Sequence, residues 1–232
     1  MYERSFVDYT NDRSYTRGMS ETVDRRRARG EASRRAVLER ATDLASVEGL
    51  DGLTIGHVAE SSGMSKSSIA GLFGGKEGLQ LAAVEAAAEI FRTVVVEPVR
   101  VQPRGVRRLA MLMRSSLDYS RNRVFSGGCF FAATAADVDS KPGPVRDAVR
   151  RWMRGWYGYV EAQARYAAEA GEITADEAMV RRLAFELIAL DNEANSRSLM
   201  TGDDEAYDLA AAAMRDRLLA LGADPAELDA LT

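Results

Sequence analysis

The sequence predicts an all-α protein of about nine helices, in which an N-terminal three-helix unit precedes a larger helical region. Apolar residues recur every three or four positions through most of the 232-residue chain, which is the spacing of one helix face. Glycine and proline separate these stretches, as at Gly74-Gly75 and at Pro142-Gly143-Pro144. No segment alternates long enough to predict a β-strand, and the chain has no internal repeat.

The composition excludes several functional classes. A single cysteine, Cys129, rules out an internal disulfide framework and a four-cysteine zinc site, and it favours a reducing, cytoplasmic location. A single histidine, His57, leaves little for metal binding or histidine-dependent catalysis, so we expect no metal ion, cofactor or catalytic site. No apolar run reaches the roughly 18 residues that a membrane span needs, and the N-terminus lacks the apolar core of a secretory signal.

Charge is distributed unevenly along the chain, although its net value is only −4. Residues 1–24 are polar and non-periodic, and we expect a disordered tail there. Arginines cluster directly behind this tail, Arg26 and Arg27 among them, whereas acidic residues prevail after Glu172. A basic front suits a protein that places one end on a polyanion. The arginine cluster is therefore either a solvated charge run or an arm that contacts phosphates or the minor groove.

The first three predicted helices form the N-terminal unit. An apolar stripe over residues 32–47 predicts the first helix, and Gly49 ends it. Thr54 suits the N-cap of the second helix, because its hydroxyl can accept a free amide of the first turn. Gly63 suits the sharp turn that follows, since glycine takes a positive φ without steric cost. Ser65 then caps a third helix that ends near Phe73.

This spacing indicates a helix-turn-helix. The residues that point outward on the third helix are Lys66, Ser67, Ser68, Ala70 and Gly71. Their side chains are mostly short, so the helix backbone could lie deep in a major groove of DNA. An ordinary pair of antiparallel helices without a nucleic-acid function is the alternative interpretation.

Six further helices are predicted behind this unit. They span about residues 76–96, 105–119, a short stretch after 128, 144–171, 176–199 and 204–221. Pro98 and Pro103 end the first of them and mark a boundary between two parts of the chain. We expect a DNA-binding domain with a basic arm at residues 25–80 and a helical ligand-binding and dimerisation domain at residues 81–232.

Residues 41–81 resemble the DNA-binding domain of the tetracycline-repressor (TetR) family of transcriptional regulators. The resemblance is carried by the turn at residues 49–52, Thr54, Val58-Ala59, Gly63-Met64-Ser65-Lys66, Ile69, Phe73 and Lys76-Glu77-Gly78-Leu79. The segment Gly127-Gly128-Cys129-Phe130-Phe131, with Gly143-Pro144-Val145-Arg146 behind it, resembles the effector domain of one TetR subgroup. The resemblance covers most of the chain after about residue 30.

The resemblance implies specific contacts with DNA. Thr54 and Lys76 would contact phosphates, and Ser65, Lys66, Ser67 and Ser68 would meet base edges and flanking phosphates. Helix N-termini offer free amides to anions, which agrees with these positions. Lys66 is the best candidate for a guanine contact. Many family members carry a tyrosine, and then a histidine or tyrosine, just before the last phenylalanine of this helix. Ala70 and Leu72 stand there instead, so no phenol contact with phosphate is expected.

The family is homodimeric, and the resemblance places the dimer interface on the last two helices. Both helices carry apolar seams, made of Val180, Leu183, Ala184, Leu187 and Ala194 and of Tyr207, Ala210, Ala211, Met214, Leu218 and Leu221. These seams either form a four-helix bundle with a second subunit or face the core of their own subunit. A dimer would place two recognition helices roughly 34–36 Å apart, or somewhat more, on a palindromic operator.

The resemblance also implies a small-molecule effector inside the second domain. The candidate ligand-binding residues are Met111, Phe130, Trp152, Trp156, Tyr159, Phe185 and Asn192. Ordinary core packing is the alternative for the aromatic residues. Glu186, Asp191, Asn192 and Asn195 interrupt an apolar helix, and buried polar groups need partners that a ligand or a second subunit could supply. Cys129 is expected to be an inert buried thiol rather than a redox sensor.

These features predict a ligand-responsive transcriptional repressor that binds an operator as a homodimer and is released by its effector. The expected mechanism is a population shift that passes through the fourth helix to the DNA-binding head. The alternative is a helical small-molecule-binding protein or enzyme whose helix-turn-helix is only structural. An enzyme is disfavoured, because the sequence has no phosphate loop, no metal-spaced His/Cys set and no recognisable nucleophile–base pair.

Overall fold

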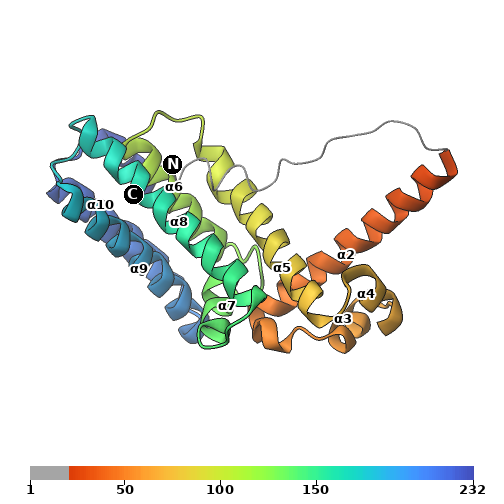
Figure 1. Ribbon diagram of the computed structural model, residues 1–232. Coiled ribbons are helices and arrows are strands. Elements are labelled where there is room, and N and C mark those ends of the chain that lie inside the picture. Colours follow the sequence, from red (N-terminus) through yellow and green to blue (C-terminus); the bar gives the residue numbers. More distant parts are fainter. Residues whose placement is uncertain (1–20) are drawn as a thin grey trace.

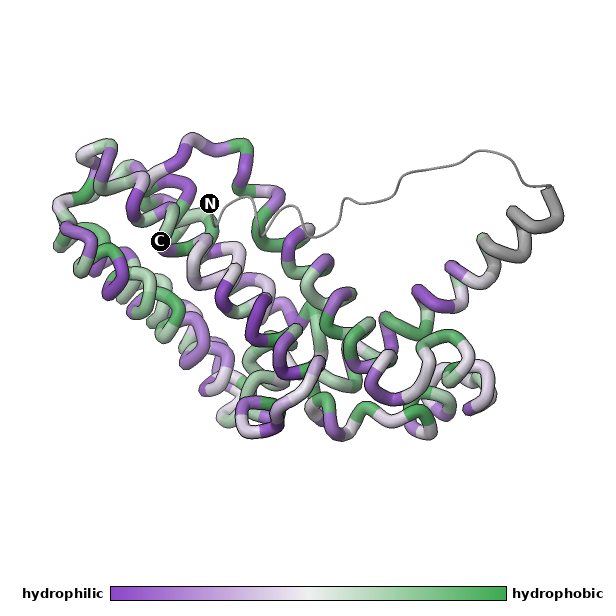
Figure 2. Tube along the Cα trace, viewed as in Figure 1, coloured by the Kyte–Doolittle hydropathy of each residue, from purple (hydrophilic) through white to green (hydrophobic). Residues whose placement is uncertain are grey.

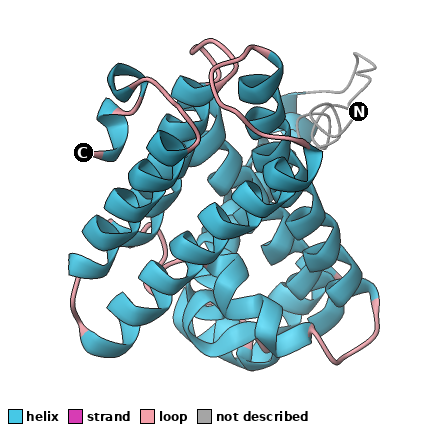
Figure 3. Ribbon diagram, turned by 90° about the vertical axis from the view of Figure 1, so that its left-hand side faces the viewer, coloured by secondary structure: helices cyan, strands magenta, loops and turns pink. Residues whose placement is uncertain are grey.

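The computed structural model describes residues 21–232, with side chains described from residue 28 onward except that of Arg29. In this range the chain forms nine α-helices and no β-sheet (Figure 3). They are α2 (Glu21–Gly52), α3 (Ile55–Ser62), α4 (Lys66–Phe73), α5 (Lys76–Phe91), α6 (Val106–Arg121), α7 (Phe130–Val138), α8 (Pro144–Glu169), α9 (Glu177–Thr201) and α10 (Glu205–Ala220). The all-α class predicted from the sequence is confirmed.

The helices are arranged in two parts joined by α5 (Figure 1). Helices α2, α3 and α4 form a head at one end, and α6 to α10 form an effector bundle at the other. Hydrophobic residues follow α5 along most of its length (Figure 2). They belong to a single continuous core that includes Leu79 in the head and Phe91 in the bundle. Among residues 21–232, no helix combines the length and apolar character needed to cross a membrane.

Helix α2 is longer than the sequence predicted. It begins at Glu21 rather than near residue 32, so the expected tail at 1–24 overlaps its first residues, and residues 1–20 lie outside the described part. The reason is that Arg, Ala and Glu, which fill this stretch, are good helix formers, and one exposed glycine, Gly30, costs only about 1 kcal/mol. The expected stop is correct, because the helix is broken at Gly49 by a positive φ of 73°.

Helix α5 also ends as the sequence suggested, in two steps. The regular helix stops at Phe91, a π-helical turn continues over Arg92–Val96, and a short 3₁₀ turn follows at Glu97–Val99. Single π turns inside or at the end of α-helices are uncommon and occur often at functional sites. The expected end near residue 96 therefore corresponds to the end of the π turn rather than of the α-helix.

The loop before α7 fastens the effector bundle to the head. The backbone N–H of Ser126 donates to Asp43 Oδ1 at 2.7 Å, and its hydroxyl donates to Asp43 Oδ2 at 3.0 Å. The N–H of Gly127 donates to Ser46 Oγ at 3.0 Å. A Cβ at Gly127 would stand 1.9 Å from the Ser46 carbonyl oxygen, so only glycine permits this approach. We call Asp43, Ser46, Ser126 and Gly127 the head latch.

Candidate DNA interface and effector site

The turn between α3 and α4 is built as the sequence predicted. Thr54 caps α3, and its Oγ1 accepts a hydrogen bond from the N–H of His57 at 3.1 Å. Gly63 ends α3 with a φ of 66°, in the left-handed region that favours glycine. Val58 and Ala59 are buried and join α3 to the core. Thr54 remains exposed, so its capping role leaves it open to solvent on one side.

The N-terminus of α4 presents a small, exposed polar edge. Ser65 caps the helix, and its Oγ accepts from the N–H of Ser68 at 3.1 Å and lies 2.9 Å from the hydroxyl of Ser67. Ser65, Lys66, Ser67 and Ser68 are all exposed, whereas Ile69 is fully buried. The four predicted DNA-contacting residues of this helix are thus brought together on one outward edge. Lys66 has no ion-pair partner among the described residues.

The other predicted DNA-binding residues are placed less uniformly. Lys76 is the first residue of α5 and is exposed, and its Nζ donates to the backbone oxygen of Asp51 at 2.9 Å. Arg26 and Arg27 lie in the first turns of α2, which extend beyond α3 and α4 in Figure 1. Their side chains lie outside the described residues, so the expected contact of this arm with DNA stays a prediction.

Two residues to which the sequence analysis gave no packing role position α4. The guanidinium of Arg34 on α2 donates through Nη1 to the Leu72 carbonyl oxygen at 2.9 Å and lies 4.5 Å from the ring centroid of Phe73. Gly78 on α5 lets the end of α4 approach closely, since a Cβ there would stand 1.8 Å from the Phe73 carbonyl oxygen. Nothing in the sequence distinguishes Arg34 from neighbouring arginines, because its partners come from a segment 38 positions away.

In the effector bundle, aromatic rings gather around Phe91. The Phe91 centroid lies 5.1 Å from Tyr119, 5.0 Å from Trp152 and 4.9 Å from Trp156, each in edge-to-face geometry. Phe131 stacks on Trp152 with centroids 3.3 Å apart. We call these five residues the aromatic cluster. Edge-to-face pairs of this kind add about 0.5–1.5 kcal/mol each beyond the area that they bury.

The predicted ligand-binding residues divide into two groups. Phe130, Trp156 and Tyr159 are buried in the bundle, and Met111 and Trp152 are partly buried against its core. Phe185 and Asn192 were wrongly placed inside, because Phe185 is 73 % exposed and Asn192 is also on the surface. Both are exposed, and because they are seven residues apart they lie on the same face of α9. The error arose because Phe185 is an aromatic residue on an otherwise largely polar face of α9, which also carries Arg181 and Arg182, so residue type alone did not reveal its exposure.

The polar residues of α9 also have different environments. Glu186 pairs with Arg217 of α10 at the surface. Asn195 is buried, and its Oδ1 accepts from the N–H of Cys129 at 3.1 Å. Asp191 is buried as well, and its Oδ2 accepts from the Ser116 hydroxyl at 2.8 Å. The polar signal in this helix was therefore informative, but its inward members are Asp191 and Asn195 rather than Asn192.

Burial changes the acidity of this region. Loss of solvation raises the pKa of Asp191 to about 7, and the hydrogen bond from Ser116 opposes this rise. Burial likewise raises the pKa of the Cys129 thiol to about 12, and the nearby Asp191 carboxylate adds to this effect. The thiol is therefore protonated at neutral pH and is a poor nucleophile. This agrees with the expectation of an inert buried cysteine.

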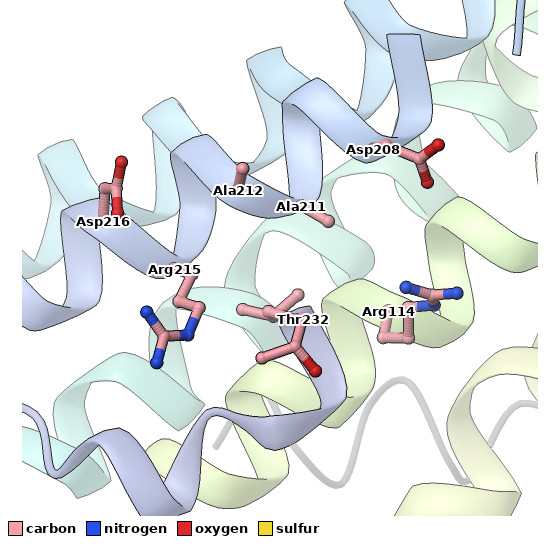
Figure 4. A pocket seen from close by; sticks show the side chains of 8 residues that line it. Arg114, Asp208, Ala211, Ala212, Arg215, Asp216 and Thr232 are labelled. Carbon is pink, nitrogen blue, oxygen red and sulfur yellow. The ribbon is translucent and has the colours of Figure 1, made fainter. Parts of the chain in front are cut away.

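A separate surface pocket of about 330 Å³ lies between α6, α10 and the end of the chain. Figure 4 shows Arg114 and Arg215 on either side of Thr232, with Asp208 and Asp216 on α10 above them. The pocket carries arginine and aspartate side chains together, so it favours neither charge sign. None of the predicted ligand-binding residues lines it.

The predicted dimer seams face the core of their own subunit. All of the seam residues named above on α9 and α10 are buried within the single chain. The opposite faces of the two helices instead expose large apolar side chains, namely Phe185, Leu199, Met200 and Leu209. The side of the molecule that carries α9 and α10 faces the viewer in Figure 3. These side chains are available for contact with another molecule.

Comparison with known proteins agrees with this arrangement. The family described as bacterial regulatory proteins, tetR family, matches residues 37–83, and the family described as tetracyclin repressor-like, C-terminal domain, matches residues 105–214. No curated protein sequence matches the chain. The two matched families contain transcriptional regulators rather than enzymes.

Solved structures share the fold. A TetR transcriptional regulator from Chloroflexus aurantiacus J-10-FL is 24% identical, with a TM-score of 0.73 over 83% of this chain and 95% of that one. A TetR-family regulator from Cytophaga hutchinsonii is 19% identical, with a TM-score of 0.71 over 88% and 98%. AibR, solved with isovaleryl coenzyme A and operator DNA, is 19% identical, with a TM-score of 0.61 over 71% and 86%.

The head with its capped, exposed recognition helix and the helical bundle behind it define a transcriptional regulator with a DNA-binding part and a ligand-binding part. The chain belongs to the TetR family.

Proposed function

We propose that this protein is a ligand-responsive transcriptional repressor that acts in the cytoplasm. The observation that carries the proposal is the exposed edge of α4, where three hydroxyls and the unpaired Lys66 ammonium stand together at a helix N-terminus. Free amides, hydroxyls and an ammonium group are the donors that phosphates and the acceptor edge of guanine require. Thr54 and Lys76, at the N-termini of α3 and α5, would add phosphate contacts on either side, and Arg26 and Arg27 would add an arm.

We further propose a homodimer that forms through α9 and α10. The exposed apolar side chains of Phe185, Met200 and Leu209 support this arrangement, since a two-fold interface pairs the same patch on both subunits. Two such subunits would present two recognition helices to one face of DNA. A palindromic operator with half-sites about one helical turn apart would fit them.

The proposed release mechanism depends on α5. Its first residue, Lys76, lies in the head, and its last residue, Phe91, lies at the centre of the aromatic cluster. An effector that enters the bundle would displace these rings and thereby move α5 and the recognition helix. The ligand shifts the population only by its differential affinity for the two arrangements. The AibR structure holds isovaleryl coenzyme A and operator DNA, which supports the presence of a small-molecule site and an operator site on one protein of this fold.

An electrophoretic shift assay tests the proposal, with DNA from upstream of the protein's own gene. Binding should weaken steeply as the salt concentration rises, because phosphate contacts release counterions. Lys66→Ala should reduce operator affinity by about ten- to hundredfold and relax its sequence preference, whereas Lys76→Ala should weaken all sequences alike. Arg107→Ala, on the exposed surface of α6, removes the same charge away from the head and from the proposed dimer helices, and it serves as the control.

Equal affinity of Lys66→Ala and Arg107→Ala for that DNA would remove the role assigned to Lys66. The proposal itself would be overturned if the protein failed to bind that DNA at low salt. In that case the head would be only a structural element. The remaining interpretation would then be a helical small-molecule-binding protein.

A further inference from the structure

The interior of the effector bundle contains a carboxylate that lacks a full set of partners. Asp191 Oδ2 accepts from Ser116, but Oδ1 is buried and has no hydrogen-bond partner. No positively charged group among the described residues interacts with it. A buried carboxylate without a cation is costly, so a protein keeps one only where something else compensates it.

A second unpaired polar group lies in the same bundle. Gln163 on α8 is completely buried, and neither its Oε1 nor its Nε2 has a hydrogen-bond partner. Native proteins leave few buried polar groups unpaired, and each such group calls for a water molecule, an ion or a ligand. Two of them in one helical bundle therefore indicate that the interior accommodates a further molecule.

Aromatic side chains connect the protein surface with Asp191. Trp152 is partly exposed, Phe91 contacts it, and Tyr119 contacts Phe91. Tyr119 follows Ser116 by three positions on α6 and both are buried, so the phenol lies on the helix face that carries the hydrogen bond from Ser116 to Asp191. The faces of tryptophan and phenylalanine attract organic cations as well as apolar groups.

We propose that the effector of this protein is a hydrophobic amine, bound as an ammonium ion against Asp191 with its apolar part among the rings of the aromatic cluster. The inference rests on the proposed function, because it specifies the ligand of the same effector domain. The ammonium group supplies the missing donor for Asp191 Oδ1 and the missing positive charge.

The test is a fluorescence titration that contains no DNA. Trp152 and Trp156 are the only tryptophans and both belong to the aromatic cluster, so their emission reports on the site. The probes are adamantylamine and its neutral counterpart adamantanol, which share one apolar body. We expect saturable binding of the amine and roughly ten- to hundredfold weaker binding of the alcohol. Asp191→Asn should lower the amine affinity by a similar factor and leave the alcohol unaffected.

The control variant is Glu193→Gln, which removes a negative charge from the exposed face of the same helix and should bind both probes as the wild type does. A pH series on the wild type provides a second measurement in case Asp191→Asn fails to fold. Amine affinity should fall by about tenfold for each pH unit below about 7, since protonation of Asp191 competes with the ligand. Tyr119 and Cys129 are the titratable groups that interact with Asp191, and both remain neutral in this range.

Three results would overturn the inference, namely equal affinity for amine and alcohol, unchanged amine affinity in Asp191→Asn, or no saturable binding of the amine at millimolar concentration. None of them bears on operator binding, which the gel-shift assay measures separately. Conversely, a protein that binds the amine but no DNA would retain this site and lose the proposed repressor function.

Discussion

Two glycines beside the recognition helix have opposite surroundings, although both belong to helices. A Cβ at Gly78 would collide with the Phe73 carbonyl oxygen at 1.8 Å, and backbone cannot move away as a flexible side chain would. A Cβ at Gly71 meets nothing within 4 Å, because this residue lies on the exposed face of α4. The first glycine is thus required by folding, and the second is available for contact with another molecule.

Alanine substitutions should separate these roles. Gly78→Ala is expected to lower the free energy of unfolding by about 1–3 kcal/mol, because the overpacked end of α4 must shift. Gly71→Ala should leave stability unchanged or raise it by up to about 1 kcal/mol, since alanine is the better helix former. It should nevertheless weaken operator binding by roughly tenfold, because its methyl group separates the helix backbone from DNA. Denaturant unfolding and gel shifts measure the two effects. Full operator affinity in Gly71→Ala would show that the backbone does not approach DNA there.

Asp191 should make stability depend on pH. Its pKa is about 7 in the folded protein against an ordinary value of 3.8, so the folded state binds the proton more tightly. The stabilisation is fully present below about pH 4 and is lost as the pH rises through about 7. One pKa unit corresponds to about 1.4 kcal/mol, which gives a total on the order of 4 kcal/mol.

The variant Asp191→Asn isolates this effect, since asparagine cannot ionise. Between about pH 4 and about pH 7 the wild type should lose stability that the variant keeps. The free energy of unfolding of the variant should therefore rise relative to that of the wild type over this range, and the difference should remain constant above it. Urea unfolding of both proteins across this range is the measurement, and contributions from other carboxylates cancel in the comparison. Parallel pH profiles would show that Asp191 is solvated or paired in the folded protein.

At the scale of single elements, the sequence predicted most of the helices. It left open whether the apolar seams of α9 and α10 face their own subunit or a second one. Caps and glycine stops at Thr54, Gly63 and Ser65 are local signals, and the structure has each of them in its predicted role. The position of Phe185 could not be predicted in this way, because residue type alone did not reveal its exposure. The packing role of Arg34 was missed because it depends on a segment 38 positions away, and that of Gly78 because it depends on how closely α5 approaches the end of α4.

The outward face of α9 and α10 allows a direct test of the proposed dimer. Phe185→Asp is expected to raise the dimer dissociation constant by at least a hundredfold. A buried phenylalanine contributes about 1.5–3 kcal/mol, and two-fold symmetry applies the loss twice. Val101→Asp is the matched control, because Val101 is a similarly exposed apolar residue outside these helices. Sedimentation equilibrium measures the constants. A dimer of unchanged strength in Phe185→Asp would place the interface elsewhere.

At the scale of the whole molecule, two connections join the head to the effector bundle. Helix α5 is one, and the head latch is the other, reinforced by the N–H of Asp51 donating to Asp137 Oδ2 of α7 at 2.8 Å. The loop that carries Ser126 and Gly127 also contacts α9, because the N–H of Cys129 donates to Asn195 Oδ1. Asp191 lies one helical turn before Asn195, so the proposed ligand site, the proposed dimer helix α9 and the head share a short chain of contacts. A molecule that altered Asp191 would therefore act on the head through both connections.

Gly127→Ala should weaken this second connection without touching the DNA-binding edge. The added methyl group collides with the Ser46 carbonyl oxygen, so the loop must withdraw from α2 and give up the hydrogen bonds of the latch. Because one hydrophobic core spans both parts, the wild type should unfold in a single calorimetric transition, whereas the variant should show an earlier, separate transition for the head. Gly30→Ala, whose new methyl group meets nothing within 4 Å, is the control and should retain one transition. Operator affinity should fall by about tenfold in Gly127→Ala, because a head that is held less firmly loses more conformational entropy when it binds DNA. A single transition at the wild-type temperature would mean that the head latch is not needed to hold the two parts together.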